Sequence, residues 1–290
     1  MKTRIITAII FGIIMGIGTM YSPQSSAILY CIVGILCLWE FYGLVLSKDG
    51  SPAANNFRKI FAVFLGILPA LVSLNENLSP YPLWKAGVYH WFMLLPFVPF
   101  VFELLSGSKK PFENIGLTIA GFLYIGFPTY LLTSMSFQDI TGRYIIMAVM
   151  LLIWANDVFA YFIGKLLGRH KIFPDISPNK TWEGTIGGFI CAILWGVVSF
   201  YCWPVIKLQL IQWVVLGAVC SVFGILGDLV ASKLKRSLQI KDTGNILPGH
   251  GGLIDRFDAF IFAMPFVVFT LCYVFNDNRL YYFYLLWHNY

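Results

Sequence analysis

Long apolar runs recur along the whole of this 290-residue chain, with short polar segments between them. Each run is close to the ~20 residues that a helix needs to cross the hydrocarbon layer of a membrane. We therefore predict an all-α fold, a polytopic transmembrane bundle of about nine spans. The predicted spans are Ile5–Met20, Ala27–Leu46, Ile60–Leu74, Leu83–Leu105, Ile115–Met135, Tyr144–Gly168, Gly184–Trp203, Ile211–Val230 and Phe257–Phe275.

Composition supports this prediction. Hydrophobic residues make up 58% of the chain and charged residues only 12%, against roughly a quarter charged in soluble domains. A soluble protein of this length could not bury so much apolar surface in one core. The first span follows Lys2 and Arg4 and could pass for a signal peptide. The alternation of the later segments across the membrane instead favours a retained span.

Basic residues predict the orientation. If the N-terminus is cytoplasmic, most of the 20 Lys and Arg residues fall on inner segments, and the exceptions are Lys85, Arg143, Lys207 and Arg279. This asymmetry is typical of membrane proteins, whose Lys and Arg are held on the cytoplasmic side. The net charge of +6 is therefore an orientation signal that also suits anionic lipids. It does not indicate nucleic-acid binding.

The chain divides into two unequal halves, which we predict to be N-terminal transmembrane helices over residues 1–140 and C-terminal helices carrying the catalytic site over residues 141–290. Glu40 and Glu103 are the only acids at membrane level in the first half. The six cysteines fall within or beside apolar spans without a CxxC pair, which indicates packing rather than a disulfide or zinc site.

Two acids lie inside predicted spans of the second half. Asp157 follows Asn156 near the middle of the sixth span, and Asp228 lies near the inner end of the eighth. A carboxylate at that depth costs about 2.5–3.5 kcal/mol or more and needs a partner, a metal or water. Helical periodicity puts one polar stripe on the eighth span, made of Ser221, Gly224, Asp228 and Ser232. The alternative interpretation is a structural ion pair between helices.

The predicted cytoplasmic connection from Ser232 to Asp258 interleaves cations with carboxylates. Carboxylates supply the hard oxygen ligands that Mg²⁺ prefers, and the metal shares phosphate oxygens with a substrate. Lys and Arg neutralise the remaining phosphate charge. Asp255 and Asp258 are three residues apart at a helix start and could point into one pocket. A merely solvated loop is the alternative.

A second inner segment runs from Asp175 to Gly184. Ser177, followed by proline, is interpreted as a helix cap or turn. Lys180 and Thr181 offer a cation and a hydroxyl to phosphate, and Glu183 could hold a metal or a basic partner. An ordinary helix start explains the same residues.

His250 lies in a glycine-rich turn. It could orient a phosphate or stabilise a leaving group, or it could simply fix the loop by a hydrogen bond. A general-base role is not expected, because a phosphate monoester with a second pKa near ~6 is already largely ionised.

The segment from Ser232 to Asp258 resembles the signature of the phosphatidate cytidylyltransferases (CDP-diacylglycerol synthases). The matching positions are Ser232, Leu234, Lys235, Arg236, Lys241, Asp242, Gly244, Leu247, Pro248, His250, Gly251, Gly252, Leu253, Asp255, Arg256, Phe257 and Asp258. Segments around Asn156-Asp157 and Ser177–Gly184 are also similar to that family, so the likeness covers about Leu151–Ala259. The first half is similar only in its set of apolar spans.

The resemblance implies that the phosphate of phosphatidic acid attacks the α-phosphorus of CTP, giving CDP-diacylglycerol and pyrophosphate in phospholipid biosynthesis. It implies Mg²⁺, with room for a second, monovalent cation such as K⁺. Asp228 and Asp255 correspond to the metal-binding acids. The other catalytic candidates are Lys241, Arg256 and His250. The substrate-binding candidates are Asn156, Asp157, Ser177, Lys180, Thr181, Glu183, Ser232, Lys235 and Arg236.

An integral protein of a bacterial inner (plasma) membrane, with its active site facing the cytoplasm, is therefore expected. Its expected partners are CTP, phosphatidic acid and membrane lipids. Assembly as a homodimer stays open. A transporter would use Asp157 and Asp228 as an ion relay, but it has no use for a cation-and-carboxylate cluster at one face. A CTP-dependent lipid or polyprenol kinase would transfer the γ-phosphoryl group instead. Nothing in the sequence favours a non-catalytic scaffold.

Overall fold

The computed structural model describes residues 2–49, 51–79, 94, 97–138, 140–244, 246 and 251–275, with side chains from Thr7 onward. Within those residues the fold is helical apart from one small two-stranded sheet. The chain forms two compact units. Unit 1 comprises Met1–Phe137 and Thr243–Ile254, and unit 2 comprises Gln138–Asp242 and Asp255–Tyr290.

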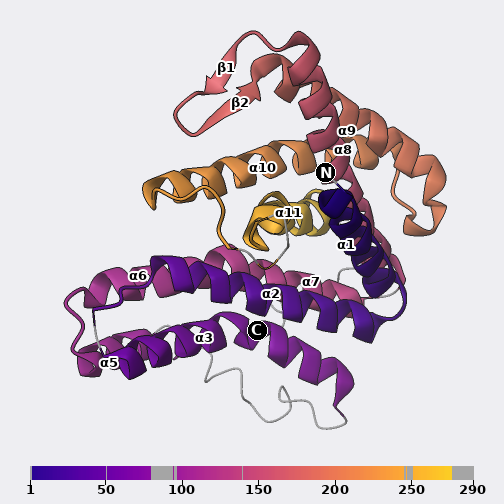
Figure 1. Cartoon of the computed structure of the whole chain (residues 1–290). Helices are drawn as coiled ribbons and strands as arrows, with labels where there is room; N and C mark the ends of the chain where they lie inside the picture. Colours follow the sequence, from indigo (N-terminus) through magenta and orange to yellow (C-terminus); the bar gives the residue numbers. More distant parts are fainter. Residues whose placement is uncertain are drawn as a thin grey trace. The chain divides into compact units, whose positions relative to one another are not determined.

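Unit 1 is a bundle whose helices α2, α3 and α7 pack on one another and run side by side in Figure 1. Its described helices are α1 (Lys2–Met20), α2 (Pro23–Val45), α3 (Pro52–Leu78), α5 (Val98–Ser106), α6 (Pro111–Gly121), the π-helical turn η3 (Phe122–Gly126) and α7 (Phe127–Phe137).

Serine and proline start two of these helices. Ser22 caps α2, because its hydroxyl accepts the Ser25 N–H at 3.0 Å while the Ser25 hydroxyl accepts the Ser22 N–H at 2.9 Å. Ser51 caps α3 in a similar way. A proline follows each cap, at the position where its missing N–H costs nothing. Local sequence therefore sets both helix starts.

A buried ion pair ties α3 to α5 within unit 1. The Arg58 side chain is 2% exposed and that of Glu103 is 3% exposed, and the Arg58 Nε donates to Glu103 Oε1 at 2.6 Å. The Arg58 Nη1 also donates to the Ser47 carbonyl, and Asn114 Nδ2 donates to the second Glu103 oxygen. Glu103 thus has the partners that an acid at membrane depth needs.

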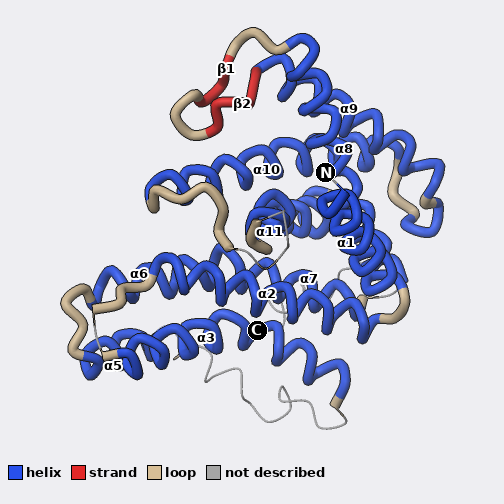
Figure 2. The backbone as a smooth tube through the Cα atoms, viewed as in Figure 1, coloured by secondary structure: helices blue, strands red, loops and turns tan. Residues whose placement is uncertain are grey.

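Unit 2 contains three long helices that pack on one another, and a hairpin. The elements are α8 (Ile140–Leu167), strands β1 (Lys171–Phe173) and β2 (Ser177–Thr181), α9 (Trp182–Cys202), the 3₁₀ turn η4 (Pro204–Ile206), α10 (Leu210–Ser237), α11 (Ile254–Phe269, in unit 2 from Asp255) and the π-helical turn η5 (Thr270–Val274). Figure 2 shows the hairpin between the ends of α8 and α9.

Helix α9 packs with its small residues inward and its large residues outward. Ile186, Ile190 and Leu194 recur every fourth residue and are 53%, 51% and 57% exposed. Gly184 and Gly188 face α8, where an added Cβ would lie 2.8 Å from the Gly164 Cα and 2.8 Å from the Ala160 Cβ. This distribution is typical of helices that pack through small residues and face lipid with large apolar ones.

The chain is a polytopic helical membrane protein. Seven segments of the described chain are long and apolar enough to cross a bilayer: Pro23–Val45, Pro52–Leu78, Pro111–Phe137, Ile140–Leu167, Trp182–Cys202, Leu210–Ser237 and Ile254–Val274. The first predicted span forms a shorter apolar helix, Thr7–Met20. Most of the fourth lies outside the described residues.

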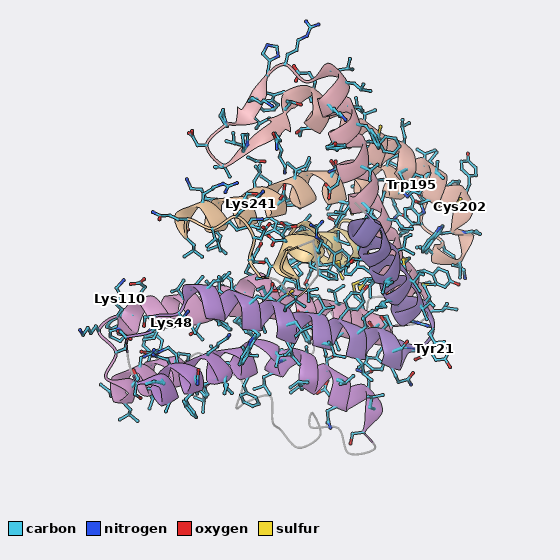
Figure 3. The ribbon with its side chains drawn as sticks, viewed as in Figure 1. Tyr21, Lys48, Lys110, Trp195, Cys202 and Lys241 are labelled. Atoms are coloured by element: carbon cyan, nitrogen blue, oxygen red, sulfur yellow. The ribbon has the colours of Figure 1, made fainter. Side chains whose placement is uncertain are left out.

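Two lysines lie at the same end of unit 1. Figure 3 shows Lys48 and Lys110 at one end of this unit and Tyr21 at the other. No disulfide joins any of the six cysteines, all of which lie in the part of the chain that the structure describes. Cys31 and Cys220 are buried as a packing role requires, whereas Cys202 is exposed.

Candidate active site

Helix α10 carries Asp228 and extends farther than its apolar run predicts. It ends at Ser237 rather than at Val230, so Ser232, Lys235 and Arg236 lie on a helix and not in the predicted connection. Basic residues in the last turn interact favourably with the carbonyl ends of a helix, which explains why the helix continues past the apolar residues. The true connection begins after Ser237.

A polar pair on α8 contacts the middle of α10. The Ser221 hydroxyl donates to Asn156 Oδ1 at 2.6 Å, and both side chains are buried. The Asn156 Nδ2 in turn donates to Asp157 Oδ1 at 3.1 Å. Asn156 is therefore held on both sides, and it fixes the direction of the Asp157 carboxylate.

The hairpin brings a lysine to Asp228. Lys180 lies on β2 and its Nζ forms an ion pair with Asp228 Oδ2. The interpretation of Ser177 as a helix cap is wrong, because Ser177 begins β2 and pairs with Phe173 of β1. The cap of α9 is Thr181, which is buried and accepts the Gly184 N–H at 3.2 Å. Pro178 suggested a turn, but Ser177–Thr181 instead forms a strand that pairs with β1.

Helix α11 carries the second acid pair of unit 2. Asp255 accepts from Lys235 Nζ at 2.7 Å, and the two side chains are 6% and 14% exposed. Asp258 is also buried, and one of its oxygens accepts the Ala259 N–H at 2.7 Å. The expected helix start at these acids is confirmed.

Close approach of α10 and α11 gathers the acids. A Cβ at Gly227 would lie 2.7 Å from the Asp258 carbonyl oxygen and 3.1 Å from the Ala259 Cα. Asp157, Asp228 and Asp258 lie within Coulombic range of one another, and Lys180 and Lys235 lie within range of Asp157 and Asp258, respectively. Three like charges this close require cationic compensation.

Glu183 stabilises the turn that precedes the hairpin. Its carboxylate accepts the N–H of Arg169 at 3.1 Å and the N–H of His170 at 3.3 Å, and it contacts the His170 Nδ1 at 2.7 Å. The basic partner suggested for Glu183 is therefore His170. These bonds orient the start of α9 and the exposed face of the hairpin.

The remaining predicted residues differ in exposure and in their partners. Ser232 is half-buried one turn after Asp228. Arg236 donates to the carbonyl oxygens of Ile176 and Ile240 at 3.4 Å each. Lys241 is exposed beyond α10, where Figure 3 labels it. Arg256 is exposed on the first turn of α11. His250 lies outside the described residues.

Mg²⁺ requires several hard oxygen ligands. In the ranges that the structure describes, no three acidic, histidine or cysteine side chains already form a group that could hold a metal. The carboxylates of Asp228 and Asp255 both supply the hard oxygen atoms that Mg²⁺ prefers, and each is paired with a lysine in this structure.

Reasoning from sequence missed two features of this cluster: Ser221 was placed on the correct stripe without a partner, and Asp258 was not assigned a role in binding. In unit 1 it also gave no role to Glu40, which binds the backbone at Leu253 and Ile254. Its signal was an acid inside an apolar span without a cation nearby in sequence.

A cavity of about 560 Å³ lies elsewhere in unit 2. It is lined by the end of α9 and the start of α10, including Phe200, Tyr201 and Leu210. Asp228 is 18 residues along α10 from Leu210, or roughly 27 Å at 1.5 Å per residue. This cavity therefore does not belong to the acid and lysine cluster.

Most of the chain is similar to known proteins. Residues 2–274 match the cytidylyltransferase family. The chain belongs to this family. The phosphatidate cytidylyltransferase of Bacillus subtilis is 32% identical over 271 residues, covering 93% of this chain and 97% of that protein. The Staphylococcus haemolyticus enzyme of the same name is 30% identical over 270 residues, covering 91% and 96%. The Staphylococcus aureus (strain COL) enzyme is 37% identical over 175 residues, covering 59% and 64%.

These matches extend the likeness seen in the motifs. The motifs covered about Leu151–Ala259, whereas the family match begins at residue 2. The apolar spans of the first half are therefore part of the family's sequence and not only similar in number.

Proposed function

We propose that this chain transfers the cytidylyl group of CTP to phosphatidic acid, releasing pyrophosphate. The observation that carries the proposal is the similarity to phosphatidate cytidylyltransferases over almost the entire length of both proteins. The lysine–carboxylate pairs of unit 2 support it, because they provide the charges that a reaction between two phosphates requires.

The proposed step is a displacement at phosphorus. A phosphate oxygen of phosphatidic acid forms a bond to the α-phosphorus of CTP, and the bond from that phosphorus to the bridging oxygen of the β-phosphate breaks. The bonding pair leaves with pyrophosphate, and CDP-diacylglycerol remains in the membrane. Both reactants are anions, so positioning and charge neutralisation account for most of the catalysis.

In this proposal the lysine and arginine side chains bind the phosphate groups of the substrates. Lys180 and Lys235 are held beside the acids by ion pairs and can contact phosphate oxygens from there. Arg256 and Lys241 are exposed and are assigned to the nucleotide phosphates. His250 is assigned to the leaving group.

Hydroxyl and amide groups complete the proposed substrate site. Ser177, Thr181 and Ser232 offer hydroxyls from β2 and α10, and Arg236 adds a cation to the same end of α10. Asn156 holds Asp157 in place, while Glu183 keeps the hairpin turn closed. These residues are proposed to orient the two substrates rather than to exchange protons.

Asp228 and Asp255 are the proposed Mg²⁺ ligands, and the carboxyl groups of Asp157 and Asp258 lie within electrostatic range of Asp228. When bound, Mg²⁺ supplies charge neutralisation at the phosphate oxygens. A second, monovalent cation such as K⁺ would be accommodated by the same excess of acid. Homodimerisation remains an open part of the proposal.

The proposed orientation has a cytoplasmic N-terminus and about nine spans in a bacterial inner (plasma) membrane. The functional division near residue 140 also remains a prediction. Lys48 and Lys110 lie at one end of unit 1, as expected for its cytoplasmic end. CTP would then reach the site from the cytoplasm, and the lipid from the inner leaflet.

The test uses purified full-length protein in detergent micelles with phosphatidic acid, Mg²⁺ and CTP labelled at either the α- or the γ-phosphorus. The α-label is expected in the lipid and the γ-label in pyrophosphate. A γ-label in the lipid would instead identify a CTP-dependent lipid kinase. Absence of label from lipid in both experiments would refute the proposed transfer and restore the transporter interpretation.

A further inference from the structure

Unit 1 contains a buried acid that the proposed chemistry does not use. Glu40 lies on α2 and is 8% exposed. A charged carboxylate at that depth persists only where it has strong partners. Its partners come from Thr243–Ile254, the segment that joins unit 1 although it is more than 200 residues away in sequence.

Three groups of that segment donate to Glu40. The Leu253 N–H donates to both carboxylate oxygens, at 3.0 and 2.8 Å. The Ile254 N–H donates to Oε2 at 3.1 Å, and the Thr243 hydroxyl donates to the same oxygen at 3.3 Å. Glu40 therefore binds the two ends of the segment at once.

Two glycines make this contact possible. A Cβ at Gly244 would lie 2.6 Å from Glu40 Oε1, and a Cβ at Gly252 would lie 2.7 Å from Oε2. Any larger residue at either position would therefore push the carboxylate out of its present place, and at Gly252 an added Cβ would also lie 2.7 Å from the backbone nitrogen of Gly244. Gly244 and Gly252 belong to the signature segment, and Glu40 supplies a physical reason for each.

The site of contact is the N-terminus of α11. Ile254 is the first residue of this helix, and the N–H groups of a helix's first turn have no partner within the helix. A carboxylate at this end accepts those N–H groups and interacts favourably with the helix dipole. Glu40 thus caps α11 from a distant part of the sequence.

We propose that Glu40 is a positioning residue for the active site, which fixes the signature segment and the first turn of α11. The inference rests on the proposed function, because Asp255 and Arg256 directly follow the residues that Glu40 holds. It assigns to the N-terminal half a role in setting the geometry of the reaction. In this proposal Glu40 acts through the backbone that it binds and not on a substrate.

The test compares Glu40→Gln and Glu40→Asp with the wild-type full-length chain in detergent. Glutamine keeps the shape but replaces one acceptor oxygen with an NH₂ donor that faces the N–H groups. Charge-assisted hydrogen bonds of this kind correspond to a loss of about tenfold to hundredfold in kcat per folded enzyme. Aspartate keeps the charge and is expected to recover part of that loss.

Hydrogen exchange gives a readout that does not depend on turnover. Glu40→Gln is expected to accelerate exchange of the Leu253 and Ile254 amides. The half-saturating Mg²⁺ concentration should rise as well, because the backbone directly before Asp255 loses the contact that fixes it, and Lys235 alone remains to hold the Asp255 side chain. Two controls are matched: Glu113→Gln alters an exposed acid of the same unit, and Glu103→Gln alters a buried one. Glu113→Gln should change nothing, and Glu103→Gln should lower thermal stability only.

Wild-type exchange and kcat in Glu40→Gln would overturn the inference. A variant with lower thermal stability but wild-type kcat per folded enzyme would also overturn it, since Glu40 would then be structural only. If the wild type itself fails to label lipid from CTP, the proposed function fails instead. In that case the exchange of Leu253 and Ile254 still decides whether Glu40 holds the segment.

Discussion

Gly227 offers the sharpest test of how the acids are brought together. The Gly227→Ala substitution adds one methyl group between α10 and α11, at a point where the neighbouring atoms are backbone atoms of Asp258 and Ala259 and the Cβ of Phe262, which moves with its backbone. The new Cβ would lie 2.6 Å from the Phe262 Cβ and 2.7 Å from the Asp258 carbonyl oxygen. The helices must therefore separate, which moves Asp228 away from Asp258.

The expected cost follows from this crowding. Overpacking a well-packed contact costs about 1–3 kcal/mol. A matched control lies one turn earlier on the same helix: a Cβ at Gly224 would lie 3.6 Å from the nearest Ile153 atom and 3.8 Å from the Ala259 Cβ, which is ordinary contact. Gly224→Ala should therefore be neutral, or stabilising by up to about 1 kcal/mol from helix propensity.

The assay measures thermal unfolding in detergent and kcat for cytidylyl transfer on the same preparations. Gly227→Ala is expected to unfold at a lower temperature and to lose kcat, while Gly224→Ala keeps wild-type kcat. Equal behaviour of the two variants would refute the reasoning, because the substitutions differ only in the space available. A Gly227→Ala protein with full activity would show that close approach of α10 and α11 is not needed for the reaction.

Three further predictions concern charge. Asp228→Asn and Asp255→Asn should each lower kcat by about a hundredfold or more at every Mg²⁺ concentration, and activity that returns at high Mg²⁺ would contradict their assignment. Arg58→Met leaves Glu103 buried without its cation and should cost about 3–5 kcal/mol, seen as earlier thermal unfolding with unchanged kcat per folded enzyme; unchanged unfolding would contradict this. The Lys109 N–H and the nearby serine hydroxyls lower the pKa of the exposed Asp49 carboxyl. The ionised carboxylate therefore stabilises the fold at pH values above the unfolded pKa of about 3.9. This stabilisation is lost as pH falls through the folded pKa. Unfolding temperature followed against pH should therefore separate wild type from Asp49→Asn at neutral pH, and the two should converge in acid; a constant difference would contradict the assignment.

Sequence alone determined the membrane character of the chain and most of its helices. Hydropathy is a local property, since each apolar run of about 20 residues must satisfy its own backbone hydrogen bonds in lipid. The cost of an acid in such a run likewise identified Asp157 and Asp228 without a structure. The ends of the helices were harder to predict from sequence. Helix α10 continues through Lys235 to Ser237, beyond the last residue of its apolar run.

Only the tertiary structure decided which charges meet. Lys180 reaches Asp228 because Ser177–Thr181 pairs as a strand, although proline suggested a turn. Glu40 binds Leu253 across more than 200 residues. No local pattern encodes such contacts, because their free energy depends on the distance and burial of groups that folding alone brings together. The sequence therefore identifies the costly polar residues, and the fold assigns their partners.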